Sequence, residues 1–479
     1  MAPYLGLRGM PLVIAITAAC STGFLLFGYD NGVFSGLTTD KVFLDAMGNP
    51  NTTLLGFIVA VYELGCLVGA LASMFWGEGL GRRMLTVCGA AWVIVGTVIQ
   101  CSSYGRAQMI VGRIVTGFGM GCITSAVPIW QCETTPAHLR ARAMAIELSF
   151  LIVGIVVAYW TDYGCSLYAN DFQWRFPIAF QIVFAIIMVI MCLMLPESPR
   201  WLASHKREQE ALEIICLLRD GTPEDEHIRA EINDIKDAIA LEEEEAGSWK
   251  DCFRDGGVMG WQRVAIACSC QALQEFSGTN IITYYAPFIP NSFGRRRLFL
   301  IGSLGMGACM LISGLTIMAG GHDNGIGTVV VLYMFQAFFT WGWMSNMWAY
   351  PSEILPLRLR QTGSALSVVW QWLITFLIVE ITPVGIQNIG WKLYIVFCIL
   401  NWATIFVVYF WYPETAGKTL EQIDFMFASQ SSLRQVVKLS TRKDFDDLAI
   451  IREAQAQAHH QKVDKNQVED IDAEQEHAE

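Results

Sequence analysis

Ionisable side chains interrupt the long apolar stretches of this 479-residue chain. An ionisable residue inside a membrane-length apolar stretch costs free energy, so it is by default a candidate for function. Asp30 ends the first such stretch, and Arg113 lies near the start of the fourth. A carboxylate beside a guanidinium stays ionised and takes up a proton more readily once the two are separated, which suits proton transfer. The alternative is a static ion pair that holds two helices together.

Three glutamates also lie within apolar stretches, namely Glu63, Glu147 and Glu380. Each is a candidate proton site if its side chain faces a cavity. Hydrogen bonding in the interior of a helix bundle is the alternative interpretation for all three.

Polar side chains gather on the apolar stretch that follows a long charged loop, at Gln274, Glu275 and Asn280. Binding of a polar solute needs several hydrogen-bond donors and acceptors arranged in a dry cavity. These three residues could supply them. Packing or hydrogen bonding between helices is the alternative.

Charged residues at the ends of the apolar stretches form a candidate gate. We predict that Glu133 and Glu353 pair with arginines across two halves of the molecule. Such pairs would hold one side shut and break as the halves rock. The alternative is that the basic residues only set the membrane topology. The predicted gate comprises Arg83, Glu133, Arg140, Glu197, Arg200, Arg296, Glu353, Arg360 and Glu414.

The elements that must position these residues are membrane-spanning helices. Hydrophobic residues make up 53% of the chain and charged residues 16%, whereas a soluble domain carries roughly a quarter charged residues. The apolar residues form blocks of about 20, the length that crosses a bilayer, and not the short alternating strands of a β-barrel. We predict eleven spans, at 12–36, 53–77, 84–101, 107–131, 143–163, 174–195, 263–290, 298–320, 327–350, 362–386 and 390–412.

Basic residues cluster in alternate loops, which predicts that those loops are cytoplasmic. The one sequon we find, at Asn51, falls in a loop predicted to lie outside, where it is a glycosylation candidate; a chance match is the alternative. We predict a cytoplasmic N-terminus at 1–11, a six-helix half at 12–195, a cytoplasmic central loop with short helices at 196–262, a second half at 263–412 and a polar tail at 413–479 that is helical near 444–456 and disordered at its end.

The two halves repeat one another, and the repeat has a gap. Two spans precede Gly81, but only one lies between Arg263 and Gly294, so the expected eighth span is missing. Either an exon has been skipped or misread, or the protein has eleven spans. A repeat of this kind is typical of transporters built from two parallel halves. The matched segments are Gly81-Arg82-Arg83 with Gly294-Arg295-Arg296, Glu133 and Pro136 with Glu353 and Pro356, and Pro196-Glu197-Ser198 with Pro413-Glu414-Thr415.

Together with further motifs, the repeat resembles the sugar-porter family of the major facilitator superfamily. The phrase at Ala158–Gly164 is most similar to the fungal branch, which holds proton symporters for sugars and polyols. The further motifs are Phe27-Gly28-Tyr29-Asp30, Arg113 with Gly117, Gly119 and Gly121, Pro196–Leu202, Ser277-Gly278 with Tyr284-Tyr285, and Pro413-Glu414-Thr415.

The resemblance implies an all-α membrane protein with a bundle of two halves that transports by alternating access. It implies that Asp30 and Arg113 are the proton-coupling pair. It also implies that Gln274, Glu275, Asn280, Trp348 and Gln371 bind the substrate. Leu148 stands where hexose porters usually carry a glutamine, which favours a polyol or another sugar over glucose.

The expected partners are a sugar or polyol, a proton and the lipid bilayer, and the expected location is the plasma membrane. No nucleophile, metal-ligand or cofactor pattern stands out in the sequence, so we expect no cofactor, no metal and no enzymatic activity. The acidic residues lie mainly in the central loop and the tail, which argues against nucleic-acid binding. Three alternatives stay open: an exporter of a small metabolite, a non-transporting nutrient receptor that signals through the tail, and a defective chain lacking one span.

Overall fold

The first half of the chain folds into six long helices and one short one. The computed structural model describes residues 6–136, 139–168, 170–244, 259–277, 294–320, 322–344 and 346–416, with short parts of 423–441, and all regular structure in them is helical. The short helix was not predicted; it begins at Asp40, whose carboxylate accepts from Val42 N at 3.0 Å. The helices are α1 (Met10–Leu37), α2 (Lys41–Ala46), α3 (Thr52–Leu80), α4 (Arg82–Cys101), α5 (Arg106–Thr134), α6 (Arg140–Cys165) and α7 (Phe172–Met194).

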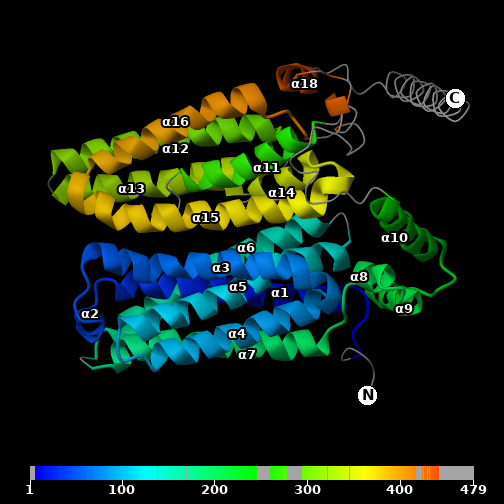
Figure 1. Ribbon diagram of the computed structural model, residues 1–479, viewed down its shortest axis with the longest axis horizontal. Helices are drawn as coiled ribbons and strands as arrows, with labels where there is room; N and C mark the ends of the chain where they lie inside the picture. The colour runs from blue at the N-terminus through cyan, green and yellow to red at the C-terminus, as the bar shows by residue number, and fades with distance from the viewer. Residues whose placement is uncertain are drawn as a thin grey trace, which may run out of the picture.

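The second half is built from α11 (Gly260–Glu275), α12 (Arg295–Ala319), α13 (His322–Phe339), α14 (Asn346–Ile354), α15 (Leu357–Ile389) and α16 (Lys392–Trp411). The span predicted at 327–350 is interrupted by a π-helical turn, Thr340–Met344, between α13 and α14. Figure 1 shows the two halves as two groups of long helices lying side by side.

Ten helices in the described residues are long and apolar enough to cross a bilayer. The predicted count of eleven is therefore not confirmed. The remaining predicted span, 263–290, corresponds to α11, which is 16 residues long and ends at Glu275. Residues 278–290 of that predicted span lie outside the described residues.

The packing of the two halves repeats, with one pair lacking. In the first half α1 packs on α6, α4 packs on both α5 and α7, and α3 packs on α5. In the second half α11 packs on α15, and α12 packs on both α13 and α16. Among the described helices nothing takes the place of α3 in the second half, which is the gap that the sequence repeat predicts.

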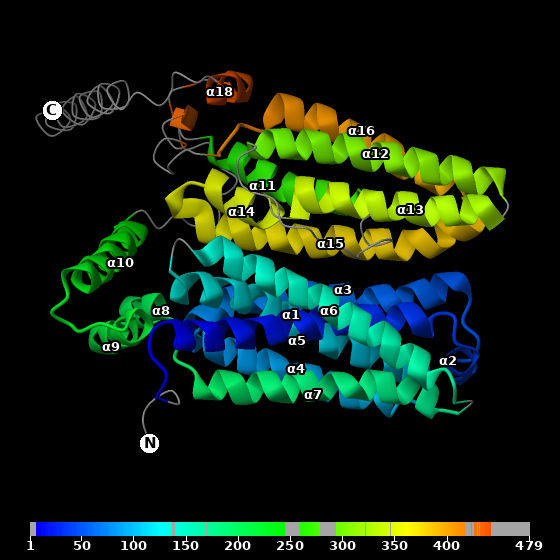
Figure 2. The same ribbon diagram turned by 180° about the vertical axis from the view of Figure 1, so that it is seen from behind.

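The central loop and the tail add short helices at one end of the bundle. These are α8 (Pro199–Ser204), α9 (Glu208–Arg219), α10 (Glu226–Glu244) and α18 (Leu433–Ser440). Figures 1 and 2 show all four at the same end, which is the predicted cytoplasmic side. The apolar face of α9 is buried under the first half, where Gly9 N donates to Leu217 O at 2.7 Å. The helix predicted near 444–456 lies outside the described residues.

Candidate functional site

Asp30 and Arg113 form a buried ion pair inside the first half. Arg113 Nη1 donates to Asp30 Oδ2 at 2.9 Å, and the side chains are 2% and 1% exposed. Arg113 Nη2 also donates to Val59 O at 3.1 Å, so the guanidinium joins α5 to both α1 and α3. The sequence predicted both residues as functional candidates, and the structure brings them together.

Two aromatic rings hold the Arg113 guanidinium from its faces. Its carbon lies 3.9 Å from the ring centre of Phe34 and 4.3 Å from that of Tyr62. Such contacts stabilise a cation that has lost its water. Asp30 Oδ1 and Arg113 Nε have no hydrogen-bond partner among the described residues. Each side chain of the pair therefore keeps one polar atom unsatisfied among the described residues.

A cavity of about 570 Å³ lies near this pair, toward the end of the bundle opposite α8–α10, although neither Asp30 nor Arg113 lines it. It lies between α1 and α3 of the first half and α15 of the second half. Phe34 and Val59, which contact Arg113, also line the cavity. Its volume is in the range of pockets that hold small ligands.

The predicted substrate residues that are described lie on two packed helices. Gln274 and Glu275 are 6% and 3% exposed on α11, and Gln371 is 7% exposed on the neighbouring α15. The oxygen Oε1 of Gln371 has no hydrogen-bond partner among the described residues. Asn280 lies outside the described residues, and so does the side chain of Trp348.

The three glutamates in apolar stretches differ in their surroundings. Glu63 is buried on α3, and charges of both halves act on it. Glu147 is fully buried on α6, and neither carboxylate oxygen has a hydrogen-bond partner among the described residues. Glu380 on α15 lies beside Gly56 of α3.

At the end of the bundle near α8, a glutamate binds the start of a helix in each half. In the first half the Glu197 carboxylate accepts from Arg82 N and Arg83 N, at 3.1 Å each. In the second half the Glu414 carboxylate accepts from Arg295 N at 2.9 Å and Arg296 N at 3.2 Å. A carboxylate at a helix N-terminus accepts hydrogen bonds from the free backbone amides and interacts favourably with the helix dipole.

Each of these two sites also contains an ion pair between an arginine and a glutamate on another helix. Arg82 Nε donates to Glu133 Oε2 at 3.1 Å, and Ser198 Oγ donates to the same oxygen at 2.5 Å. The second half repeats this arrangement. There Arg295 Nη2 donates to Glu353 Oε1 at 2.5 Å, and Thr415 Oγ1 donates to Glu353 Oε2 at 2.8 Å.

The gate differs from the prediction in two respects. The ion pairs use Arg82 and Arg295, whereas Arg83 and Arg296 donate to the backbone oxygens of Leu195 and Tyr409. Adjacent residues of a helix point about 100° apart, so only one arginine of each motif faces the glutamate. Both described pairs also lie within one half and do not join the halves. Arg200 lies on α8 at this end, and the side chains of Arg140 and Arg360 lie outside the described part.

Comparison with known proteins decides the family. The model described as "Sugar (and other) transporter" matches residues 15–294 and 288–427, two segments that meet where the eighth span is expected. Sugar transporter STL1 of Saccharomyces cerevisiae is 36% identical over 469 residues, covering 88% of this chain and 82% of that protein. MFS-type transporter oryC of Aspergillus oryzae is 34% identical, covering 90% of this chain and 88% of that protein. The chain belongs to the sugar transporter family of the major facilitator superfamily.

Solved structures agree on the fold of the transporter. The proton:xylose symporter XylE, in a structure with 6-bromo-6-deoxy-D-glucose, matches with a TM-score of 0.73 at 23% identity, over 87% of this chain and 99% of that one. At this identity the likeness shows the fold alone. The predictions of family, two-half helical bundle and a transporter instead of an enzyme are confirmed. The transporter is a multi-pass membrane protein.

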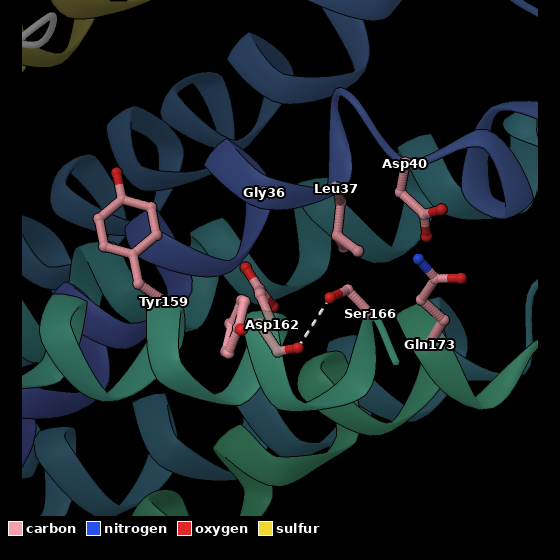
Figure 3. A pocket seen from close by; sticks show the side chains of 8 residues that line it. Gly36, Leu37, Asp40, Tyr159, Asp162, Ser166 and Gln173 are labelled. Carbon is pink, nitrogen blue, oxygen red and sulfur yellow. Dashed lines mark hydrogen bonds between the residues drawn. The ribbon is translucent and has the colours of Figure 1, made fainter. Parts of the chain in front are cut away.

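A second cavity, of about 240 Å³, lies between α1 and α6 of the transporter at the end away from the gate. Figure 3 shows Asp162 facing Gly36 within it, with Asp40 and Gln173 nearby. A Cβ atom at Gly36 would lie 2.4 Å from Asp162 Oδ2, so the carboxylate occupies the space that a side chain would need. None of the predicted site residues lines this cavity.

Sequence reasoning missed several side chains of the candidate site. Phe34 and Tyr62 gave no signal, because aromatic residues are common in apolar spans. Ser198 and Thr415 did carry one, since both are hydroxyl residues at matched positions of the repeat. The sequon residue Asn51 is exposed at the start of α3, where its side chain accepts from Leu54 N at 2.8 Å. Its glycosylation stays a prediction.

Proposed function

We propose that the transporter imports a sugar or polyol together with a proton across the plasma membrane by alternating access. The observation that carries this proposal is the buried Asp30–Arg113 pair beside a cavity that opens away from the gate. The solute would bind between the halves, near Gln274, Glu275 and Gln371, with Asn280 and Trp348 as further contacts. The family membership and the printed names of the relatives support a sugar-like cargo.

The coupling step uses Asp30 and Arg113. A proton from the outer medium binds the Asp30 carboxylate as the helices that hold the pair shift apart. Protonated Asp30 is neutral, so the pair no longer anchors α1 to α5, and the halves can rock. Release of the proton to the other side restores the ion pair. The paired charges near α8, Arg82–Glu133 and Arg295–Glu353, brace each half while the inner side is closed.

Labelled solutes tested in reconstituted vesicles check this proposal. We expect wild-type protein to exchange at least one of xylose, glucose and glycerol, and to accumulate it when the outside is acidic. The variant Asp30→Asn should keep exchange but lose accumulation driven by the pH gradient, because the side chain no longer binds a proton. Accumulation by Asp30→Asn equal to that of wild type would contradict the coupling role.

A further inference from the structure

The cavity of about 240 Å³ at the end of the first half away from the gate holds polar side chains that the proposed transport path does not use. It is lined by Gly36 and Leu37 from the end of α1, Asp40 at the start of α2, Asp162 near the end of α6 and Gln173 from the start of α7. Four helices therefore meet around this cavity (Figure 3).

Two carboxylates of this cavity lack hydrogen-bond donors. Both oxygens of Asp162 are buried without a partner among the described residues, and so is Oδ2 of Asp40. Oδ1 of Asp40 accepts from Val42 N at 3.0 Å, which fixes Asp40 as the cap of α2. A carboxylate that has lost its water without gaining donors costs free energy. The cavity therefore favours an occupant that brings donors to these three oxygens.

The Asp162 carboxylate lies against the backbone of α1. A Cβ atom at Gly36 would lie 2.4 Å from Asp162 Oδ2 and 3.1 Å from Asp162 Cγ. Only a glycine at this position leaves room for the carboxylate. An occupant that binds Asp162 would therefore hold the end of α6 to the last turn of α1.

The other lining side chains suit a small organic molecule with several hydroxyl groups. Gln173 carries an amide with donors and an acceptor, and Ser166 carries a hydroxyl group. Tyr159 and Tyr163 add aromatic rings, as is common in ligand pockets. The volume is below the range of about 300 to 1,000 Å³ for pockets of drug-sized ligands, so the occupant must be small. Among the described residues, no group of three or more acidic, histidine or cysteine side chains could hold a metal ion.

We propose that this cavity is a second solute-binding site of the transporter, for a small neutral polyol whose neighbouring hydroxyl groups donate to Asp162 and Asp40. Hydroxyl groups that donate to a carboxylate form charge-assisted hydrogen bonds, which are stronger than neutral ones. The oxygens of the same hydroxyl groups can accept from the amide of Gln173. The carbon atoms of the polyol pack on the tyrosine rings.

This second site lies off the proposed transport path. Asn31, Ser35 and Thr38 of α1 line the cavity between the halves, whereas Gly36 and Leu37 line this one. Successive residues of a helix point about 100° apart, so the two sets lie on roughly opposite faces of α1. A polyol bound by Asp162 would fix the end of the helix that carries Asp30. This consequence for transport rests on the proposed function, but the binding itself does not.

Protection of an introduced cysteine tests the proposal in the full chain in lipid nanodiscs. Ser166→Cys places a thiol group in the cavity, and its labelling by a water-soluble maleimide is followed with and without glycerol or xylitol. We expect at least one of the two polyols to slow the labelling about twofold or more, since half-occupied sites leave half of the thiols free. Leu167→Cys is the matched control, because this neighbour is 75% exposed and does not line the cavity. Its labelling rate should not change.

Three further variants, each combined with Ser166→Cys, decide where the polyol binds. Asp162→Asn should abolish the protection, because the charge and one acceptor oxygen are gone. Asp40→Asn should weaken the protection while keeping the cap of α2, since asparagine caps helices as well as aspartate does. It therefore serves if Asp162→Asn does not fold. Gln371→Ala changes the proposed transport site and should leave the protection intact.

Several results would overturn the proposal. One is protection by neither polyol, and another is protection by sodium or ammonium chloride in place of the polyols, which would indicate a cation site. Protection that survives Asp162→Asn and Asp40→Asn, or that disappears in Gln371→Ala, would place the polyol elsewhere. Solute transport by a protein whose Ser166→Cys variant shows no protection would remove this second site and leave the proposed function intact.

Discussion

The same small set of side chains lies in each half at the end of the bundle near α8. An arginine at the start of a helix binds a glutamate from the end of another helix, and a hydroxyl residue donates to that glutamate. The glutamate of the Pro-Glu-Ser or Pro-Glu-Thr motif binds the backbone of the arginine. The sets are Arg82, Glu133, Ser198 and Glu197 in the first half and Arg295, Glu353, Thr415 and Glu414 in the second.

A double-mutant cycle on Arg82 and Glu133 measures the strength of one such pair. The side chains are only 20% and 11% exposed, so we expect a coupling free energy of about 1 kcal/mol or more from thermal unfolding in detergent. The control is the exposed pair Arg207–Glu210, with 49% and 53% exposure, where solvent screens the charges and no measurable coupling is expected. Equal coupling free energies in the two cycles would contradict the expectation that the Arg82–Glu133 pair is the stronger of the two.

The sequence repeat predicts which motifs form the inner sites, but not which arginine of each motif makes the ion pair. Arg82 and Arg83 are adjacent, and the choice depends on the exact residue at which α4 begins. Sequence patterns place helix ends only to within a few residues. The Asp30–Arg113 pair was easier to predict, because each charge stands alone in an apolar span.

At the scale of helices, glycines decide how closely neighbours approach. A Cβ atom at Gly154 of α6 would lie 2.1 Å from Leu25 O of α1, and one at Gly28 would lie 1.9 Å from Leu151 O. These two positions let the backbones of α1 and α6 touch, as small residues commonly do between membrane helices. The contact holds the helix that carries Asp30.

Replacing Gly154 with a larger residue should therefore destabilise the folded transporter. We expect Gly154→Ala to lower the melting temperature of the purified transporter, because the added methyl group forces α1 and α6 apart. Gly164→Ala is the matched control on the same helix, since nothing lies within 4 Å of a Cβ atom there. Its melting temperature should equal that of wild type or rise slightly, because alanine favours the helix. If Gly164→Ala lowered the melting temperature as much as Gly154→Ala, the close contact between α1 and α6 would not be the cause.

Apolar length predicts the long helices well, and their ends lie within a few residues of the prediction except in the span predicted at 263–290, where α11 ends at Glu275. The π-helical turn at Thr340–Met344 and the tail helix α18 were not predicted. The turn lies inside one continuous apolar stretch, so hydropathy gives no sign of it. The helix α18 is only 8 residues long, and it buries Val436 against the core of the second half.

At the scale of the whole molecule, no helix in the described part of the second half corresponds to α3. In the first half Gly121 of α5 lies against Cys66 of α3. Trp341 holds the matching place before Glu353 in the second half, and it is 42% exposed. The repeat in the sequence predicted this gap, because charged motifs mark the start of each span. Sequence alone could not show that the remaining helices keep the packing of the first half, since that depends on contacts between distant segments.

We propose that this chain couples solute entry to proton entry, although the sequence repeat of its second half has a gap. The most direct measurement is the pH of a weakly buffered suspension of vesicles containing the purified transporter, recorded after addition of xylose, glucose or glycerol. We expect at least one of these solutes to make the outer medium more alkaline and Asp30→Asn to abolish the change. A solute that enters the vesicles without any proton movement would contradict the account, and so would the entry of none of the three.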